Sequence, residues 1–212
     1  MVLFYIRHSK DFQNEEATHA HDARLTQDGK DLAEKTGRKL IKRYGYPQIV
    51  YCSPFRRTKE TMKSMFKKVN PQEVAKIEII YDAELSRYFT KEEKQNASVD
   101  EKTEAANIPI YENVVEFGER TERLVKRMAR YVDSSVIVWC ITHTTVYKRL
   151  SKIYDVTLPS YIPYNHYFAL GHPRRIETAP ADKTSTVSKP NTVSTVSTGE
   201  KHFCPDCGKY HR

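Results

Sequence analysis

Two histidines and a pair of arginines follow three apolar runs of the sequence. The run VLFYI ends at Arg7 and His8, and the run VIVWCI is followed, after one threonine, by His143. A third run, IVYC, leads within a few residues to Arg56 and Arg57. A buried strand needs neither arginine nor histidine at its end, so these side chains are candidates for a shared chemical task.

These residue types favour phosphoryl transfer. A guanidinium group matches two phosphate oxygens with parallel charge-assisted hydrogen bonds. A histidine ring nitrogen can act as a nucleophile, and neighbouring cations discourage its protonation. A fourth apolar run precedes Asp82 and Glu84, and a carboxylic acid there could protonate the departing oxygen. Because phosphoryl transfer mainly needs positioning and neutralisation of negative charge, this set predicts a site that requires no metal.

The four apolar runs alternate with helical patterns, which predicts how the site is assembled. Helices are predicted over residues 25–45, 56–69, 114–132 and 145–156, and strands over 2–6, 48–53, 76–85, 135–145 and 166–171. Thr26 and Gly45 stand where the first helix should be capped at its two ends. Alternating strands and helices predict a three-layer α/β/α sandwich with a mainly parallel sheet. Ligands bind beyond the carboxyl ends of such strands, where Arg7, Ser53, Asp82 and Thr142 stand.

The composition fits a globular protein of 212 residues, with 39% hydrophobic and 29% charged residues. The formal net charge of +8 favours phosphorylated or polyanionic partners, but the basic residues are mixed with acidic ones, which favours a solvated surface over a nucleic-acid site. No apolar stretch is long enough to span a bilayer, and MVLFYIRHSK lacks the design of a secretory signal. We therefore expect a cytoplasmic protein with no membrane partner, in which Cys52 and Cys140 are reduced and buried.

The predicted organisation is a domain over residues 1–176, a disordered Ser/Thr/Pro-rich linker over 177–199 and a short Cys/His tail over 200–212. Within the domain, the polar segment 86–110 is predicted to form a lid. The tail resembles the linker and first half of a C2H2 zinc finger. Its candidate zinc ligands are Cys204, Cys207, His202 and His211. A disordered tail and a redox-sensitive cysteine pair are the alternatives.

Five motifs in order resemble those of the histidine phosphatase superfamily, which includes phosphoglycerate mutases and many phosphomonoesterases. The resemblance runs from Val2 to about Gly171. RHSKDFQN is similar to the opening signature Arg-His-Gly-Glu-Thr-x-x-Asn, and YCSPFRRTKET resembles Ser-Pro-x-x-Arg-x-x-x-Thr, which selects Arg57 over Arg56. DARLTQDGKDLA resembles the start of the first helix, CITHTTVYKRL the segment of the second histidine, and IPYNHYFAL the closing loop and edge strand.

The resemblance implies a role for each candidate residue. His8 would be the phosphorylated nucleophile, Arg7, Arg57 and His143 would form the phosphate pocket, and Asn14 would be an auxiliary phosphate contact.

Several positions depart from the family pattern. Ser9, Lys10 and Asp11 replace Gly, Glu and Thr of the first signature, and Thr142 replaces a common Gly. Arg87 stands where the family usually has its acidic residue. Glu84 is therefore the substitute candidate for the proton donor, with Asp82 and Glu92 as further candidates.

The expected activity is that of a histidine acid phosphatase or phosphoglycerate mutase-like phosphatase. It would hydrolyse a phosphomonoester through a phosphohistidine at His8, with no cofactor required for catalysis. The expected partner is a small phosphorylated substrate or a phosphoprotein. The alternatives are a phosphoglycerate-type mutase and a non-catalytic phospholigand-binding or scaffolding protein with a degenerate acid site.

Overall fold

The computed structural model describes residues 2–12, 23–88, 112–131 and 134–171, and the backbone of 202–204 and 209–211. The chain divides into two compact units, Met1–Ile176 and Glu177–Arg212. Several parts of the predictions lie outside the described residues: the linker 177–199, most of the lid and the candidates Asn14, Glu92 and Cys207.

A five-stranded sheet forms the centre of the first unit. Its strands are β1 (Val2–Arg7), β2 (Ile49–Cys52), β3 (Glu78–Tyr81), β4 (Ile137–Thr142) and β5 (Tyr167–Leu170). Their order is β3-β2-β4-β1-β5; the first four are parallel, and β5 runs antiparallel to β1. The predicted mainly parallel sheet is confirmed.

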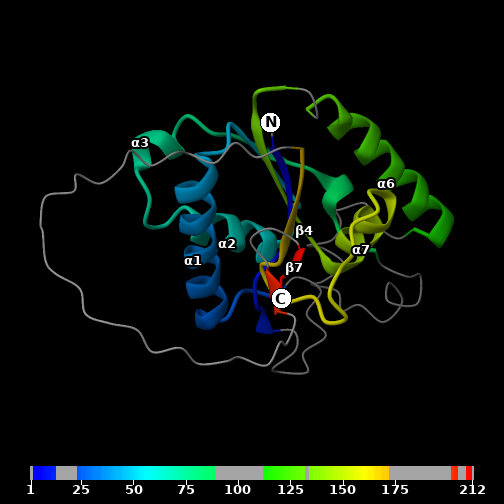
Figure 1. The fold of residues 1–212 in the computed structure, drawn as a ribbon, viewed down its shortest axis with the longest axis horizontal. Helices are drawn as coiled ribbons and strands as arrows, with labels where there is room; N and C mark the ends of the chain where they lie inside the picture. Colours follow the sequence, from blue (N-terminus) through cyan, green and yellow to red (C-terminus); the bar gives the residue numbers. More distant parts are fainter. Residues whose placement is uncertain are drawn as a thin grey trace, which may run out of the picture. The chain divides into compact units, whose positions relative to one another are not determined.

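Helices cover both faces of this sheet. They are α1 (Gln27–Tyr44), α2 (Arg56–Met65), α3 (Pro71–Val74), α6 (Val114–Ala129) and α7 (Thr144–Ile153), and a 3₁₀ turn, η2, spans Ala83–Leu85. Figure 1 shows α1 and α2 on one side of the sheet and α6 and α7 on the other, which confirms the three-layer sandwich. The predicted helix 56–69 ends early, at Met65, and a separate turn, α3, begins after Asn70, whose side chain accepts a hydrogen bond from the Gln72 amide.

Successive side chains of β1 point to opposite faces of the sheet and so divide the core into two layers. Phe4 and Ile6 pack with side chains of α1 and α2, whereas Leu3 and Tyr5 pack with those of α6 and α7. A strand buried on both faces reads as a continuous apolar run, which explains why VLFYI shows no polar alternation. Cys52 and Cys140 are free and buried, as predicted.

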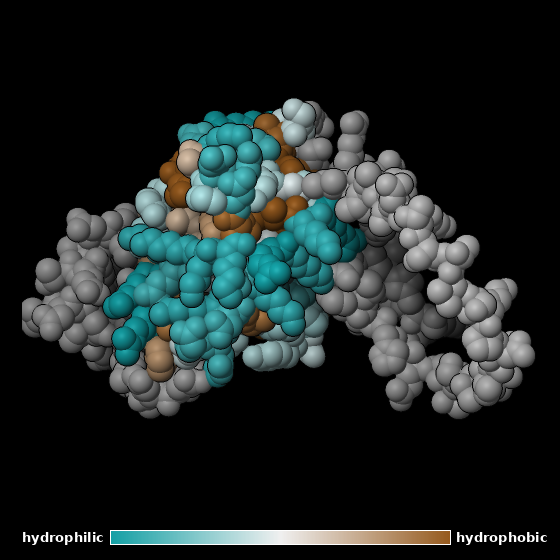
Figure 2. Space-filling model, turned by 90° about the vertical axis from the view of Figure 1, so that its left-hand side faces the viewer, coloured by the Kyte–Doolittle hydropathy of each residue, from teal (hydrophilic) through white to brown (hydrophobic). Residues whose placement is uncertain are grey.

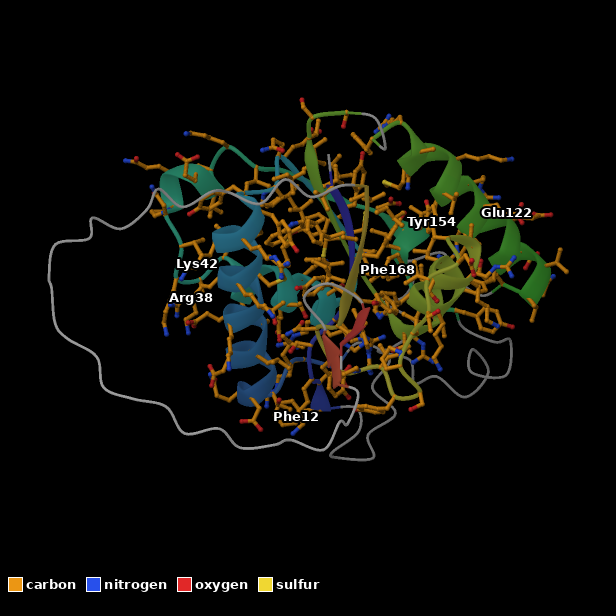
Figure 3. The ribbon with its side chains drawn as sticks, viewed as in Figure 1. Phe12, Arg38, Lys42, Glu122, Tyr154 and Phe168 are labelled. Atoms are coloured by element: carbon orange, nitrogen blue, oxygen red, sulfur yellow. The ribbon has the colours of Figure 1, made fainter. Side chains whose placement is uncertain are left out.

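Figure 3 shows the same division from the side chains: Tyr154 and Phe168 lie between the sheet and α7. Arg38, Lys42 and Glu122 point outward from α1 and α6. Figure 2 looks onto the side of the molecule where α1 lies, and hydrophilic residues dominate it. The basic residues of α1 therefore contribute to a hydrophilic surface.

Both predicted caps of α1 are present. The Thr26 side chain accepts a hydrogen bond from the Gly29 amide at 3.0 Å. At the other end, Gly45 has a φ of 93°, and its amide bonds to the carbonyl of Ile41. This left-handed conformation suits glycine because a Cβ would strain it. Within the described part of the chain, no helix combines the length and apolar character needed to cross a membrane.

The second unit contains a β-hairpin of β6 (His202–Cys204) and β7 (Lys209–His211). The strands are antiparallel, and His202 is the register partner of His211. Cys207 lies outside the described residues.

Zinc binding by this hairpin stays a prediction. We expect the full-length chain, purified without chelator, to carry about one zinc ion per molecule. The double variant Cys204→Ser/Cys207→Ser should lose it, because thiolates are the strongest zinc ligands of the set. Metal content measured by mass spectrometry checks this, with Cys52→Ser as the control. An equal zinc content in the double variant would contradict the prediction.

Candidate active site

The pairing of β1 with β4 brings the two histidines together. Arg7 and Thr142 are register partners in this parallel pair, and the His8 amide donates to the Thr142 carbonyl at 2.9 Å. His8 and His143 follow directly, and their ring centroids are 5.3 Å apart. Both side chains are buried, with exposed fractions of 7% and 2%. The carboxyl ends of two adjacent strands thus supply two imidazoles to one place.

One ring nitrogen of His8 is hydrogen-bonded to the backbone, and the other is available to react. The Nδ1 atom lies 2.8 Å from the Ser9 carbonyl oxygen, and because a carbonyl can only accept, Nδ1 carries the proton. The lone pair of a neutral ring then resides on Nε2. Burial, followed by the charge of Arg57, lowers the pKa of His8 well below its ordinary value. The structure therefore holds His8 neutral and in the tautomer that a nucleophile needs.

His143 is bound on both ring nitrogens. Arg57 donates through Nε to Nδ1 at 3.1 Å, so the ring proton of a neutral His143 lies on Nε2, 2.9 Å from the Ser53 hydroxyl. Burial and then the charge of Arg57 lower the pKa of His143 well below its ordinary value. These bonds fix the orientation of the ring next to His8.

The loop that carries His8 packs tightly on α1 and α2. The Ser9 hydroxyl donates to the Gly29 carbonyl at 2.6 Å, and the Ser9 amide donates to the Thr61 hydroxyl at 3.0 Å. A Cβ on Gly29 would lie 2.1 Å from the Lys10 carbonyl oxygen, so only glycine permits this approach. Three of the predicted motifs therefore meet in the contacts that hold the loop of His8.

A cavity of about 290 Å³ opens beside the two histidines. Its lining residues come from five segments of the chain and include three arginines: Arg7, His8, Asp11, Arg57, Arg87, His143, Thr144, Thr145 and Tyr164. Arg57 is 1% exposed. The Arg7 guanidinium donates to the Ile162 carbonyl and lies over the Tyr164 ring, 4.3 Å from its centroid.

The electrostatics of this cavity favour an anion. Helix α7 begins at the cavity wall with Thr144, so its positive N-terminal end adds to the arginine charges. The Nε atom of Arg7 is buried, and no described residue accepts a hydrogen bond from it. The structure thus brings together the predicted residues Arg7, His8, Arg57 and His143 around a space in which a phosphate group would be neutralised.

Glu84, the predicted proton donor, does not lie at this cavity. Glu84 is absent from the cavity lining, because its carboxylate is held by Arg123 at 3.3 Å and by Arg127 at 2.9 Å, both on α6. Asp82 also pairs with Arg127, and its side chain caps η2 by accepting from the Glu84 amide at 3.0 Å. The sequence placed Glu84 at a strand end correctly but could not show that α6 would pair with it.

Asp11 is the carboxylate that the sequence reasoning missed. It is 2% exposed and lines the cavity, with Oδ2 3.9 Å from His8 Nδ1 and 3.7 Å from Arg57 Nε. At this distance its charge stabilises positive charge on either partner. The sequence did contain one indication of Asp11: it replaces the threonine of the family's opening signature.

The lowered pKa of His8 predicts the pH dependence of any reaction that uses it as nucleophile. Protonation would remove the lone pair, and this requires a pH below the lowered pKa, which is itself below about 6.5. We expect kcat/KM on an activated aryl phosphate to show no fall attributable to the enzyme between pH 8 and pH 6.5. Titration of the free substrate provides the correction. An enzyme-derived acid limb with a midpoint above pH 6.5 would contradict the prediction.

In this mainly parallel α/β/α sandwich, two adjacent histidines and three arginines line one cavity, an arrangement that suits a phosphoryl group. The family model of the histidine phosphatase superfamily (branch 1) matches residues 3–163 of the chain. The chain therefore belongs to this superfamily, as the motifs of the sequence predicted. No curated protein matches the chain significantly.

Solved structures share this fold at low sequence identity. The phosphoglycerate mutase from Bacillus anthracis superimposes with a TM-score of 0.58 at 17% identity, covering 82% of this chain and 90% of that one. A mycobacterial glucosyl-3-phosphoglycerate phosphatase, solved with VO₃, has a TM-score of 0.56 at 16% identity, covering 79% and 90%. The α-ribazole phosphatase from Shigella flexneri superimposes with a TM-score of 0.56 at 16% identity, covering 80% of this chain and 89% of that one. Both phosphatases and a mutase are thus built on this fold.

Proposed function

We propose that the protein is a phosphatase that works through a phosphohistidine at His8. The observation that carries this proposal is the state of that side chain. It is a neutral, buried imidazole whose Nδ1 proton is bound to the Ser9 carbonyl, so that Nε2 is available at a cavity lined by arginines. The resemblance of the sequence to the superfamily assigns the same role to the same residue.

The first step is transfer of the phosphoryl group to the protein. The substrate phosphate is bound by Arg7 and Arg57, with His143 beside it. The Nε2 lone pair of His8 attacks phosphorus, a P–N bond forms, and the bond from phosphorus to the leaving oxygen breaks. The imidazole then carries a positive charge, because it keeps its Nδ1 proton, and the nearby Asp11 carboxylate stabilises that charge.

The second step restores the protein. A water oxygen forms a new bond to phosphorus, the P–N bond breaks, and its electron pair returns to Nε2. Both water hydrogens remain on the departing phosphate, as H₂PO₄⁻, so His8 regains its starting protonation state. The groups named here perform both steps without a metal or an organic cofactor, which is our proposal for the reaction.

A mutase is the second candidate, supported by the fold shared with the Bacillus anthracis phosphoglycerate mutase. A mutase would return the phosphoryl group to a bound product, whereas a phosphatase passes it to water. We rank hydrolysis first because the opening signature departs from the family pattern at Ser9, Lys10 and Asp11. A non-catalytic phospholigand-binding protein would keep the cavity without turnover.

The experiment that separates these three functions uses a panel of phosphorylated metabolites, aryl phosphates and phosphopeptides. A phosphatase releases inorganic phosphate and forms a phosphoenzyme that is acid-labile and alkali-stable, as phosphohistidine is. A mutase instead interconverts phosphoglycerate isomers with little phosphate release. Binding of vanadate without turnover of any substrate would support the non-catalytic alternative and overturn the proposal.

A further inference from the structure

Arg87 is held at the cavity by the backbone on which it stands. The Thr142 hydroxyl donates to the Leu85 carbonyl at 2.6 Å. The Arg120 guanidinium donates through Nη1 to the Ser86 carbonyl at 3.0 Å. Arg120 and Thr142 belong to α6 and β4, so two layers of the fold fix the residues immediately before Arg87. Its position at the site is therefore set by the fold and not by a free loop.

A further bond fixes the following residue. The Tyr88 amide donates to the Thr145 hydroxyl at 3.3 Å, and Thr145 itself lines the cavity at the start of α7. Arg87 is half-buried, lines the same cavity, and its charge contributes to the lowered pKa values of both His8 and His143.

No described carboxylate stands where a leaving group would be protonated. In phosphoryl transfer the attacking and leaving atoms lie roughly in line through phosphorus, so the leaving oxygen departs on the side away from His8 Nε2. Asp11 lies near Nδ1, on the other side of the imidazole ring, and Glu84 is paired with α6. A cation, Arg87, occupies the position after β3 instead.

We propose that Arg87 makes this site selective for phosphoryl groups on acidic oxygens, namely acyl phosphates, aryl phosphates and phosphoanhydrides. This inference rests on the proposed function. The leaving groups of these compounds are carboxylates, phenolates and phosphates, which depart as stable anions. Arg87 neutralises the negative charge that develops on the leaving oxygen, so no proton is needed.

The step balances without an acid. The P–O bond breaks, its electron pair stays on the leaving oxygen, and the product leaves as an anion while His8 takes the phosphoryl group. An alkyl alcohol is a much weaker acid, and its alkoxide must be protonated as it departs. General acid catalysis contributes about 10²- to 10⁴-fold, so alkyl phosphates should be slower by at least that factor.

A neighbouring cavity supports an anionic leaving group. It measures about 480 Å³, shares Thr145 with the phosphate cavity, and is lined by Lys148, Arg149 and Lys152 as well as by apolar side chains such as Phe117. Basic groups with an apolar wall suit the anion of an aromatic or carboxylic acid.

The test is the dependence of kcat/KM on the leaving group. The substrates are a series of aryl phosphates with phenols of increasing pKa, acetyl phosphate, and glycerol phosphate as the alkyl member. We expect the wild-type chain to hydrolyse acetyl phosphate and the activated aryl phosphates at least about 10²-fold faster than glycerol phosphate. Arg87→Gln should lower kcat on the activated substrates about 10-fold or more, since one charge on the leaving oxygen is lost.

Arg87→Glu is the decisive second variant. It supplies a carboxylic acid at the same backbone position, so the ratio of activated to alkyl turnover should narrow about 10-fold or more, whereas Arg87→Gln should not narrow it. Arg56→Gln, at an exposed arginine outside the cavity, is the matched control.

Two outcomes would overturn the inference. One is a wild-type chain that hydrolyses alkyl and activated aryl phosphates within about 10-fold of each other. The other is an Arg87→Gln variant whose rate constants across the leaving-group series equal those of the wild type. In either case, a phosphohistidine that still forms on His8 leaves the proposed function intact; if no phosphoenzyme forms on any substrate, the proposed function fails as well.

Discussion

Replacing His8 with asparagine should abolish turnover of an activated aryl phosphate, with kcat falling by at least about 10⁴-fold. Asparagine keeps a polar side chain of similar size near the Ser9 carbonyl but offers no nucleophilic ring nitrogen. Because Arg7 and Arg57, the proposed phosphate contacts, are retained, vanadate or phosphate should still bind to the variant. The measurement is phosphate release, together with a radiolabelled phosphoenzyme assay that should give no labelled protein.

The structure also says what must stay unchanged in that variant. His8 is buried, so the thermal unfolding midpoint of the variant should be compared with that of the wild-type protein. Binding of vanadate or phosphate to the variant shows that the cavity persists. A variant that is folded, binds vanadate and still turns over the substrate would reject His8 as the nucleophile.

Substitutions of the adjacent residues Arg56 and Arg57 should have very different effects on kcat/KM. Arg57→Gln should lower kcat/KM by about 10²- to 10³-fold, the usual loss when one donor to a developing negative charge is removed. Arg57 is 1% exposed, lines the cavity and donates to His143 Nδ1, so its loss removes a proposed phosphate contact and the hydrogen bond that orients the second imidazole. Arg56→Gln should stay within about 3-fold of wild type, because Arg56 pairs with Glu60 on the exposed side of α2.

Steady-state kinetics and inhibition by vanadate measure both variants. Loss of Arg57 should raise the inhibition constant for vanadate as well as lower kcat, since in the proposed mechanism the same guanidinium holds the ground-state anion and the transferring group. Equal effects of the two substitutions would show that the pocket is built from a different arginine.

Much of this site could be predicted from the sequence because its residues stand at the ends of apolar runs. The order of strands and helices fixed the parallel sheet, and parallel strands end on one rim, so Arg7, His8, Arg57 and His143 had to come close. The caps Thr26 and Gly45 were readable because their signals are local. The resemblance of YCSPFRRTKET to the family motif Ser-Pro-x-x-Arg-x-x-x-Thr separated Arg57 from Arg56.

The carboxylates were not predictable in the same way. Glu84 follows a strand end as the histidines do, but its direction is decided by Arg123 and Arg127 on a helix far along the chain. Asp11 is near the nucleophile in sequence, yet its burial between His8 and Arg57 depends on how the loop packs on Gly29. Pairings between charged groups on distant elements leave no periodic pattern in the sequence, so only the folded chain shows them.

The pairing of β1 with β4 also sets the moment at which the protein becomes competent. Two strands and the long helix α6 separate His8 from His143 along the chain, so during synthesis His8 emerges well before the second imidazole. A nascent chain that lacks β4 has no second histidine beside His8 and no Thr142 carbonyl to accept from the His8 amide. The proposed phosphoryl chemistry therefore requires that β4 has taken its place between β2 and β1.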